Sequence, residues 1–306
     1  MSTTPQPLAG IRILSLALNL PGPAALMRCR ALGADCLKFE PPAGDPMSHY
    51  SAQAYEELHA GVTVRKVDLK TLEGQAALQV ALAQTDVLIT SFRPSALAKL
   101  GLSWDALHQA HPHLSQVAIV GAAGASAEIP GHDLTYQAEH GLVSGLHLPP
   151  TLFADMGGAL MATEAVLQAL VARRNEGSMA ATAAQEEARA PTGKTQPGQY
   201  FEVALADAAA FLALPRRWGL TRPQDIIGGA HAGYQVYACR DGRIAVAALE
   251  PHFARRLMEA AGLRAETDPL APEAKESLKR FFAIHSRDEL DALAASRDIP
   301  MHSLRD

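Results

Sequence analysis

The sequence predicts an α/β protein in which a large domain with a parallel β-sheet precedes a smaller α+β domain. Short apolar runs alternate with segments of helical periodicity as far as residue 120, a pattern that favours a parallel sheet covered by helices on both faces. A change of composition follows a long helical segment, and a hairpin pattern starts near residue 234. These two features indicate a second domain of different construction.

The large domain is predicted over residues 1–227 and begins with a strand and a helix. An apolar strand over residues 11–17 leads through the turn Pro21-Gly22-Pro23 into a helix over residues 24–32, which Gly33 ends. The same patterns predict strands over residues 36–39, 86–90, 116–120 and 200–206, helices over residues 74–83, 104–110 and 157–174, and a last helix that ends at residue 214.

The predicted helix over residues 157–174 has an apolar stripe on one face, and Arg173 and Arg174 suit its negative C-terminal end. The segment that follows, residues 175–198, is rich in Ala, Gly, Pro, Thr and Glu. Because it has almost no large apolar residue to bury, we expect an exposed, mobile insertion loop.

The small domain is predicted over residues 228–306, with a hinge at Gly228-Gly229. Strands over residues 234–239 and 244–248 flank the turn Asp241-Gly242 and predict a hairpin. Helical patterns then cover residues 251–261, 272–284 and 288–295.

Composition and motifs disfavour several classes of function. The net charge of -5 provides no general field for nucleic acid or an anionic membrane. The turn Leu20-Pro21-Gly22-Pro23 lacks the glycine pattern and the lysine of nucleotide-binding loops. Three cysteines without Cys-x-x-Cys spacing argue against disulfides and thiolate metal sites, so we expect a cytoplasmic protein without a metal. The start of the chain resembles neither a secretion signal nor a membrane span.

Asp155 has two interpretations, which stay open on sequence alone. It precedes Gly157-Gly158 and the predicted helix, where an ordinary N-cap carboxylate accepts hydrogen bonds from the first-turn amides. Alternatively, it is a catalytic acid beside an anion site, because the amides of Gly157 and Gly158 at a helix start would stabilise an oxyanion.

His132 and Glu250 also have a structural and a functional interpretation. His132, in Gly131-His132-Asp133, is either a hydrogen-bonded loop residue or a base. Glu250 precedes Pro251, which opens a helix, so it is either a solvated acid at the helix start or a partner of the site. Taken singly, each residue favours its structural interpretation.

Two basic residues lie at or near strand ends, where open α/β sheets bind their ligands. Arg93 follows the strand over residues 86–90, and Lys38 lies near the end of the strand over residues 36–39. Each would hold a phosphate group or form an ion pair.

An ordered series of motifs resembles the family III CoA transferases, a superfamily that includes formyl-CoA and carnitine CoA-transferases and alpha-methylacyl-CoA racemase. The resemblance covers nearly the whole chain. Its motifs are Pro7-Leu8-Ala9-Gly10-Ile11-Arg12-Ile13-Leu14, Pro21-Gly22-Pro23, Leu32-Gly33-Ala34-Asp35-Cys36-Leu37-Lys38-Phe39-Glu40-Pro41-Pro42, Gly44-Asp45-Pro46, Val67-Asp68-Leu69-Lys70, Asp86-Val87-Leu88-Ile89, Phe92-Arg93-Pro94 and Leu100-Gly101-Leu102.

Three further motifs are similar to the racemase branch, namely Gly131-His132-Asp133, Ala154-Asp155-Met156-Gly157-Gly158 and Ala248-Leu249-Glu250-Pro251-His252-Phe253. The resemblance implies that His132 and Asp155 are the two bases and that Glu250 supports His132. It also implies a Rossmann-like large domain and a homodimer of interlocked chains, with the site between the large domain of one chain and the small domain of the other. Acyl-CoA would be the substrate, with coenzyme A as part of it and no permanently bound cofactor.

The assignment of two bases has a chemical reason. Inversion at the α-carbon of an acyl thioester needs one acid/base group on each face of the carbon.

Two alternatives to a racemase remain. The chain is a CoA transferase with Asp155 as nucleophile, or a divergent homologue with impaired CoA binding or catalysis. Ala60 and Val62 stand where the family commonly has basic residues, and the family usually continues beyond the position of Asp306. Because the family usually continues beyond this position, we expect a weaker dimer.

Overall fold

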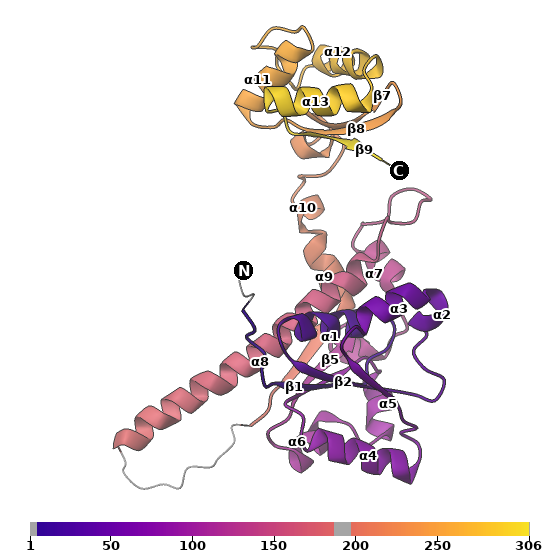
Figure 1. Cartoon of the computed structure of the whole chain (residues 1–306), viewed down its shortest axis with the longest axis vertical. Helices are drawn as coiled ribbons and strands as arrows, with labels where there is room; N and C mark the ends of the chain where they lie inside the picture. Colours follow the sequence, from indigo (N-terminus) through magenta and orange to yellow (C-terminus); the bar gives the residue numbers. More distant parts are fainter. Residues whose placement is uncertain (1–4, 187–196, 306) are drawn as a thin grey trace. The chain divides into compact units, whose positions relative to one another are not determined.

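The computed structural model describes residues 5–186 and 197–305, and the side chains of these except those of residues 174–186. The chain forms two compact units, one that ends at Ala213 and one that starts at Leu214 (Figure 1). The boundary lies before the one predicted after residue 227, because the short helix α10 (Leu214–Arg217) and the 3-10 turn η2 (Ile226–Gly228) belong to the second unit.

The large unit contains a six-stranded sheet in the order β3-β2-β1-β4-β5-β6, and each pair of neighbours is parallel. This is the Rossmann order, which confirms the predicted α/β class. The strands are β1 (Arg12–Ser15), β2 (Asp35–Glu40), β3 (Thr63–Lys66), β4 (Val87–Thr90), β5 (Ser115–Val120) and β6 (Tyr200–Ala204).

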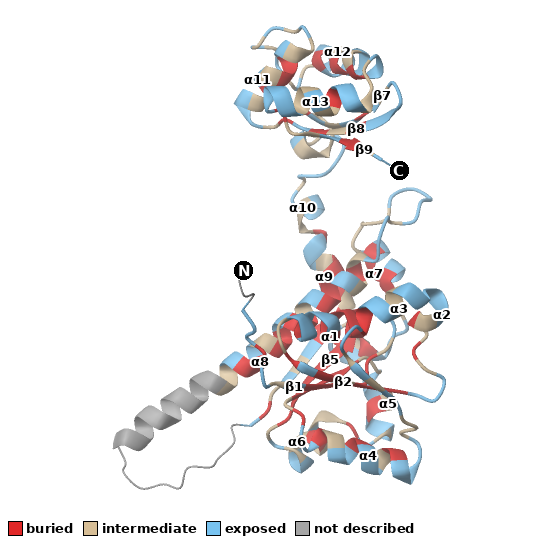
Figure 2. Ribbon diagram, in the orientation of Figure 1, coloured by how far each residue is buried: buried red, intermediate tan, exposed pale blue. Residues whose placement is uncertain are grey.

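Helices cover both faces of this sheet (Figure 1). Ile13 and Ile89 of the central strands pack on one face with helices α1 and α8, whereas Leu14 and Leu88 pack on the other with α4 to α6. Both faces are therefore buried, as the continuous apolar strands predict (Figure 2). The helices are α1 (Pro21–Ala31), α2 (Met47–Tyr50), α3 (Ala52–Leu58), α4 (Leu72–Leu82), α5 (Pro94–Lys99), α6 (Trp104–Ala110), α7 (Asp133–Glu139), α8 (Phe153–Glu186) and α9 (Leu205–Leu212), with a 3-10 turn η1 (Gly124–Glu128).

Helix α8 is longer than predicted at both ends. It begins at Phe153 rather than at residue 157, and it continues to Glu186, so the loop expected from residue 175 is wrong as far as Glu186. Residues 187–196 of that prediction lie outside the described residues, whereas Pro197 and Gly198 have no regular secondary structure, as expected, although Gly198 is buried.

The small unit contains an antiparallel sheet in the order β7-β8-β9 and, besides the short α10, three longer helices. Its apolar core contains Tyr237, Ile244, Leu278 and Phe282. The predicted hairpin is present, and the strand β9 completes the sheet. After α10 and η2, its elements are β7 (Tyr234–Cys239), β8 (Gly242–Ala247), α11 (Pro251–Ala260), α12 (Pro272–Ala283), α13 (Arg287–Arg297) and β9 (Met301–Leu304).

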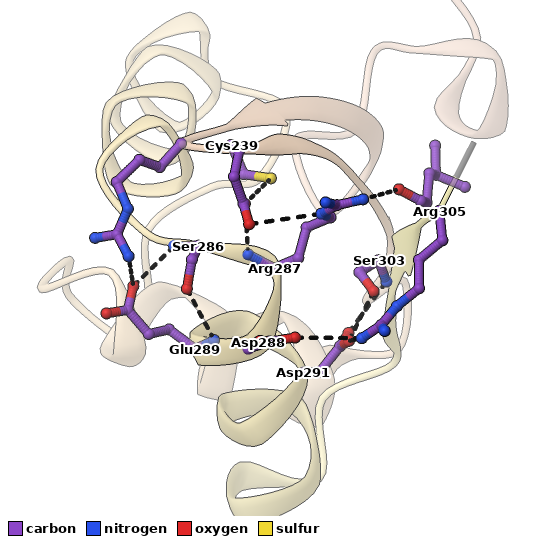
Figure 3. A network of polar contacts seen from close by, with 11 residues as sticks. Cys239, Ser286, Arg287, Asp288, Glu289, Asp291, Ser303 and Arg305 are labelled. Atoms are coloured by element: carbon purple, nitrogen blue, oxygen red, sulfur yellow. Dashed lines mark hydrogen bonds and ion pairs between the residues drawn. The ribbon is translucent and has the colours of Figure 1, made fainter.

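A polar network fastens β9 to α13 in this unit (Figure 3). Asp291 accepts hydrogen bonds from the amide and the hydroxyl of Ser303, at 3.1 and 2.7 Å. Arg305 lies 3.2 Å from Asp288 and 3.6 Å from Asp291.

Within residues 5–186 and 197–305, every helix is too short or too polar to cross a lipid bilayer.

Candidate active site

A cavity of about 360 Å³ lies in the large unit at the carboxyl ends of the central strands. The segments after β1, β4 and β5 all line it, with Asn19, Phe92 and Gly121 as examples. The chain crosses from one side of the sheet to the other between β1 and β4. Such a switch point is where open α/β sheets bind their ligands.

His132 and Asp155 line this one cavity, together with Arg93. His132 is the N-cap residue of α7, Asp155 lies in the first turn of α8, and Arg93 is the N-cap residue of α5. Three loops separated in sequence thus converge on one space. His132 and Asp155, the two bases that the family resemblance implies, thus line the same cavity.

Asp155 is not the N-cap of its helix. It is the third residue of α8, and its amide donates to Asp133 Oδ1 at 3.0 Å. Gln137 donates to the other oxygen of Asp133 and to Thr151 O, so the Asp133 carboxylate is fixed at the start of α8. The predicted capping role therefore belongs to Asp133, and the Asp155 carboxyl is left to face the cavity.

The electrostatic environment of Asp155 favours its protonated form. Burial, followed by the negative charge of Asp133, raises the pKa of Asp155 from 3.8 to about 7. A carboxyl with this pKa both accepts and donates a proton near neutral pH.

Tyr136 forms part of the cavity wall and was not singled out from the sequence. Its ring is packed so closely that a Cβ on Gly121 or Gly131 would collide with the hydroxyl end. Among the described residues the Tyr136 hydroxyl has no hydrogen-bond partner, and burial next to Asp155 raises its pKa. Gly121 and Gly131, which also line the cavity, were the available sequence signal for this close packing.

The loop after β1 is held in an uncommon conformation. Asn19 has a φ of 66°, in the left-handed region, and its amide donates to Asp45 Oδ1 at 3.0 Å. The Leu18 amide donates to the hydroxyl of Ser91 after β4, at 3.0 Å. The first bond joins the loop after β1 to the segment after β2, and the second joins the loops after β1 and β4 to each other.

A second, mainly apolar pocket of about 140 Å³ adjoins the cavity, since Leu18 and Phe92 line both. Phe39, Leu100 and Lys70 also line it. The arrangement offers apolar walls for a flat ring, and a cation at the edge for a phosphate group.

Three predicted binding residues lie elsewhere. Lys38 is fully buried and paired with Asp45, so its prediction as a phosphate ligand is wrong. Gly157 and Gly158 lie past the first turn of α8, where amides bond to the preceding turn, so they offer no free donors to an anion. Their lack of side chains instead lets α8 approach α9, because a Cβ on Gly157 would lie 3.1 Å from Leu212.

Glu250 lies in the small unit, as an exposed N-cap residue of α11. Its predicted support of His132 from a partner chain stays a prediction.

The raised pKa of Asp155 makes a prediction about stability. Between about pH 4 and about pH 7 the unfolded chain has lost the Asp155 proton while the folded chain keeps it. The stabilising contribution is therefore complete below the unfolded pKa and is lost as the pH rises through about 7. We expect the Tm of the wild type, minus that of Asp155→Asn, to fall over this range. A difference that does not change with pH would contradict the assignment, and Asp207→Asn, an exposed carboxylate in the first turn of α9, is the control.

Sequence comparisons identify relatives over nearly the whole chain. The model for CoA-transferase family III matches residues 8–306. Alpha-methylacyl-CoA racemase from Mus musculus is 28% identical over 306 residues, covering 92% of this chain and 73% of that protein. Succinate–glutarate CoA-transferase from Agrobacterium fabrum is 27% identical over 291 residues, covering 86% of this chain and 68% of that protein.

Solved structures share the fold. A CAIB/BAIF family protein from Brucella suis has a TM-score of 0.77 at 24% identity, covering 99% of this chain and 85% of that one. The protein Rv3272 from Mycobacterium tuberculosis has a TM-score of 0.78 at 22% identity, covering 99% of this chain and 86% of that one.

Proposed function

Because this chain belongs to CoA-transferase family III, we propose that it moves a proton at the α-carbon of a 2-methylacyl-CoA thioester, as a racemase. His132 and Asp155 are the proposed bases, one for each face of the carbon. The observation that carries the proposal is their common cavity, in which Asp155 has a pKa near neutrality.

The enolate formed between the two proton transfers needs a hydrogen-bond donor near the thioester oxygen. Gly157 and Gly158 cannot serve, because their amides belong to the helix interior. The Tyr136 hydroxyl, which lines the cavity and lacks a partner among the described residues, is the proposed donor.

Coenzyme A enters this proposal as part of the substrate. Its adenine ring is assigned to the apolar pocket beside the cavity, which Phe39 and Phe92 line and where Lys70 offers a cation. Arg93 lies at the cavity itself, and its guanidinium suits a phosphate oxygen pair.

Arg93→Met is expected to weaken CoA binding by roughly tenfold or more, because it removes charge-assisted hydrogen bonds. Isothermal titration of the variant with CoA measures this loss. Arg255→Met, which removes an exposed arginine of the small unit, is the control and should bind as the wild type does. Equal affinity of Arg93→Met and the control would remove Arg93 from the CoA site.

The proposal is tested by incubating the protein in deuterated water with 2-methylacyl-CoA esters of several chain lengths. Deuterium uptake at the α-carbon, measured by mass spectrometry, is expected with at least one of them. No uptake above background with any ester would refute the proposed reaction.

A second candidate is a CoA transferase in which the Asp155 carboxylate attacks the thioester carbonyl, forming a mixed anhydride and releasing the CoA thiolate. The similarity to CoA-transferases favours this candidate. One of them, succinyl-CoA–D-citramalate CoA-transferase from Chloroflexus aurantiacus, is 34% identical over 182 residues, which cover 55% of this chain and 45% of that protein. Hydroxylamine added with acyl-CoA would trap the anhydride and inactivate a transferase, whereas a racemase would stay active.

A homologue with impaired CoA binding is the remaining alternative. Ala60 and Val62 lie in the turn between α3 and β3, with Ala60 exposed, and neither offers a positive charge. Micromolar binding of CoA in a titration would count against this alternative.

The proposed homodimer, in which Glu250 of one chain supports His132 of the other, is tested separately. Sedimentation measures whether the protein is a dimer in solution.

A further inference from the structure

The large unit contains a buried lysine that the proposed proton transfer does not use. Lys38, in β2, is 0% exposed. Its Nζ lies 2.5 Å from Asp45 Oδ2, 3.1 Å from Glu40 Oε1 and 2.8 Å from His59 Nε2. Asp45 and His59 are hydrogen-bond partners of the ammonium group, and Glu40 forms an ion pair with it. The chain itself thus provides three partners for the Lys38 cation.

The hydrogen bonds of His59 define which of its nitrogens accepts. Nδ1 lies 2.7 Å from Tyr55 O, and a carbonyl oxygen only accepts, so Nδ1 carries the proton. Nε2 of the neutral ring is then free to accept from Lys38. Glu40 also accepts from the Tyr55 hydroxyl at 3.0 Å. The cluster therefore holds one cation, two carboxylates and a neutral imidazole.

Asp45 connects this cluster to the cavity. While Oδ2 binds Lys38, Oδ1 accepts from the Asn19 amide at 3.0 Å and from the Met47 amide at 2.9 Å. Asn19 and Met47 both line the cavity that contains His132 and Asp155. Since Asn19 has a positive φ, its loop needs an external bond to hold this conformation. The buried carboxylate supplies that bond.

The three partners of Lys38 form a donor set that suits a divalent cation. One ligand atom from each of Glu40, Asp45 and His59 lies within 4.8 Å of the others. Carboxylate oxygen and imidazole nitrogen are ordinary Zn²⁺ ligands. The Lys38 ammonium contacts all three groups, so it occupies the position that a divalent metal cation would take among them.

We propose that Lys38 is a positioning residue, whose ammonium acts as a built-in cation that fixes Asp45 and, through Asp45, the cavity loop at Asn19. The consequence for turnover rests on the proposed function, whereas the consequence for the loop does not. Removal of the ammonium should free the loop and leave a pocket that binds zinc.

The test uses the full chain as wild type, Lys38→Ala and Lys279→Ala, the last being an exposed lysine as matched control. Hydrogen exchange at the Asn19 and Met47 amides reports on the loop. We expect protection of both in the wild type and the control, and a loss of roughly tenfold or more in Lys38→Ala. The rate of α-proton exchange should fall in that variant by roughly tenfold or more, because a displaced loop misplaces the substrate.

Zinc chloride provides the second arm. Lys38→Ala is expected to bind one Zn²⁺ by calorimetry and to regain protection at Asn19, whereas the double variant Lys38→Ala/Asp45→Ala should do neither. Unchanged protection in Lys38→Ala, or zinc that does not bind or binds without restoring protection, would overturn the proposal.

If Lys38→Ala does not fold, hydrogen exchange of the wild-type protein still tests the proposal. An Asn19 amide that exchanges as fast as an unstructured peptide would then refute it. Wild-type protein that shows the expected loop protection but no α-proton exchange would refute the proposed function and leave the role of Lys38 standing.

Discussion

Asp155→Asn is expected to lower α-proton exchange of 2-methylacyl-CoA by about a hundredfold or more, because an amide cannot take or give the proton. The fold should be retained. Asparagine has nearly the shape of the carboxyl, and the bond that links α8 to Asp133 comes from the backbone amide of residue 155, which the substitution keeps. CoA affinity should change little. Mass spectrometry of the exchanged thioester and a thermal melt measure the two effects.

Asp207→Asn is the matched control, since it also replaces a first-turn aspartate, in α9. Its exchange rate should equal that of the wild type. A folded Asp155→Asn protein with full activity would defeat Asp155 as base and as nucleophile.

His132→Gln should separate proton exchange from inversion. With one base removed, the enantiomer whose α-proton faces Asp155 still exchanges, but the opposite face has no group to deliver a proton. We therefore expect racemisation to fall by about a hundredfold or more while exchange of one enantiomer persists. The bond to Thr135 comes from the backbone amide of His132, so the start of α7 should be kept.

His147→Gln, in an exposed loop, is the control for the loss of an imidazole. Chiral chromatography of products from each enantiomer gives the two rates. Full racemisation by His132→Gln would show that this histidine is not one of the bases.

The sequence predicts the sheet best where strands are apolar and buried. β4 is fully buried, and its continuous apolar run identifies it. β3, in contrast, is an edge strand of which Val64 alone is not exposed, so it has no apolar pattern to detect. The start of α8 escapes prediction because Gly157 and Gly158, which look like a helix boundary, are tolerated by close packing against α9.

The candidate site is only partly visible in the sequence. His132, Asp155 and Arg93 follow from motifs and strand ends, and they meet in one cavity. The hydrogen bond that the Asp155 amide donates to the Asp133 carboxylate spans 22 residues, which no local pattern reveals. Lys38 misleads because β2 continues to Glu40, so the lysine lies inside the strand rather than beyond its end.

Two bases on opposite faces of the α-carbon should exchange its proton whenever the configuration inverts. Incubation of each pure enantiomer of a 2-methylacyl-CoA with wild-type protein in deuterated water, with configuration and α-deuterium followed together, measures this directly. Both enantiomers are expected to approach the same mixture, and every inverted molecule should carry deuterium at the α-carbon. Inversion without deuterium, or retention of configuration and of the α-proton in both enantiomers, would contradict the two-base exchange.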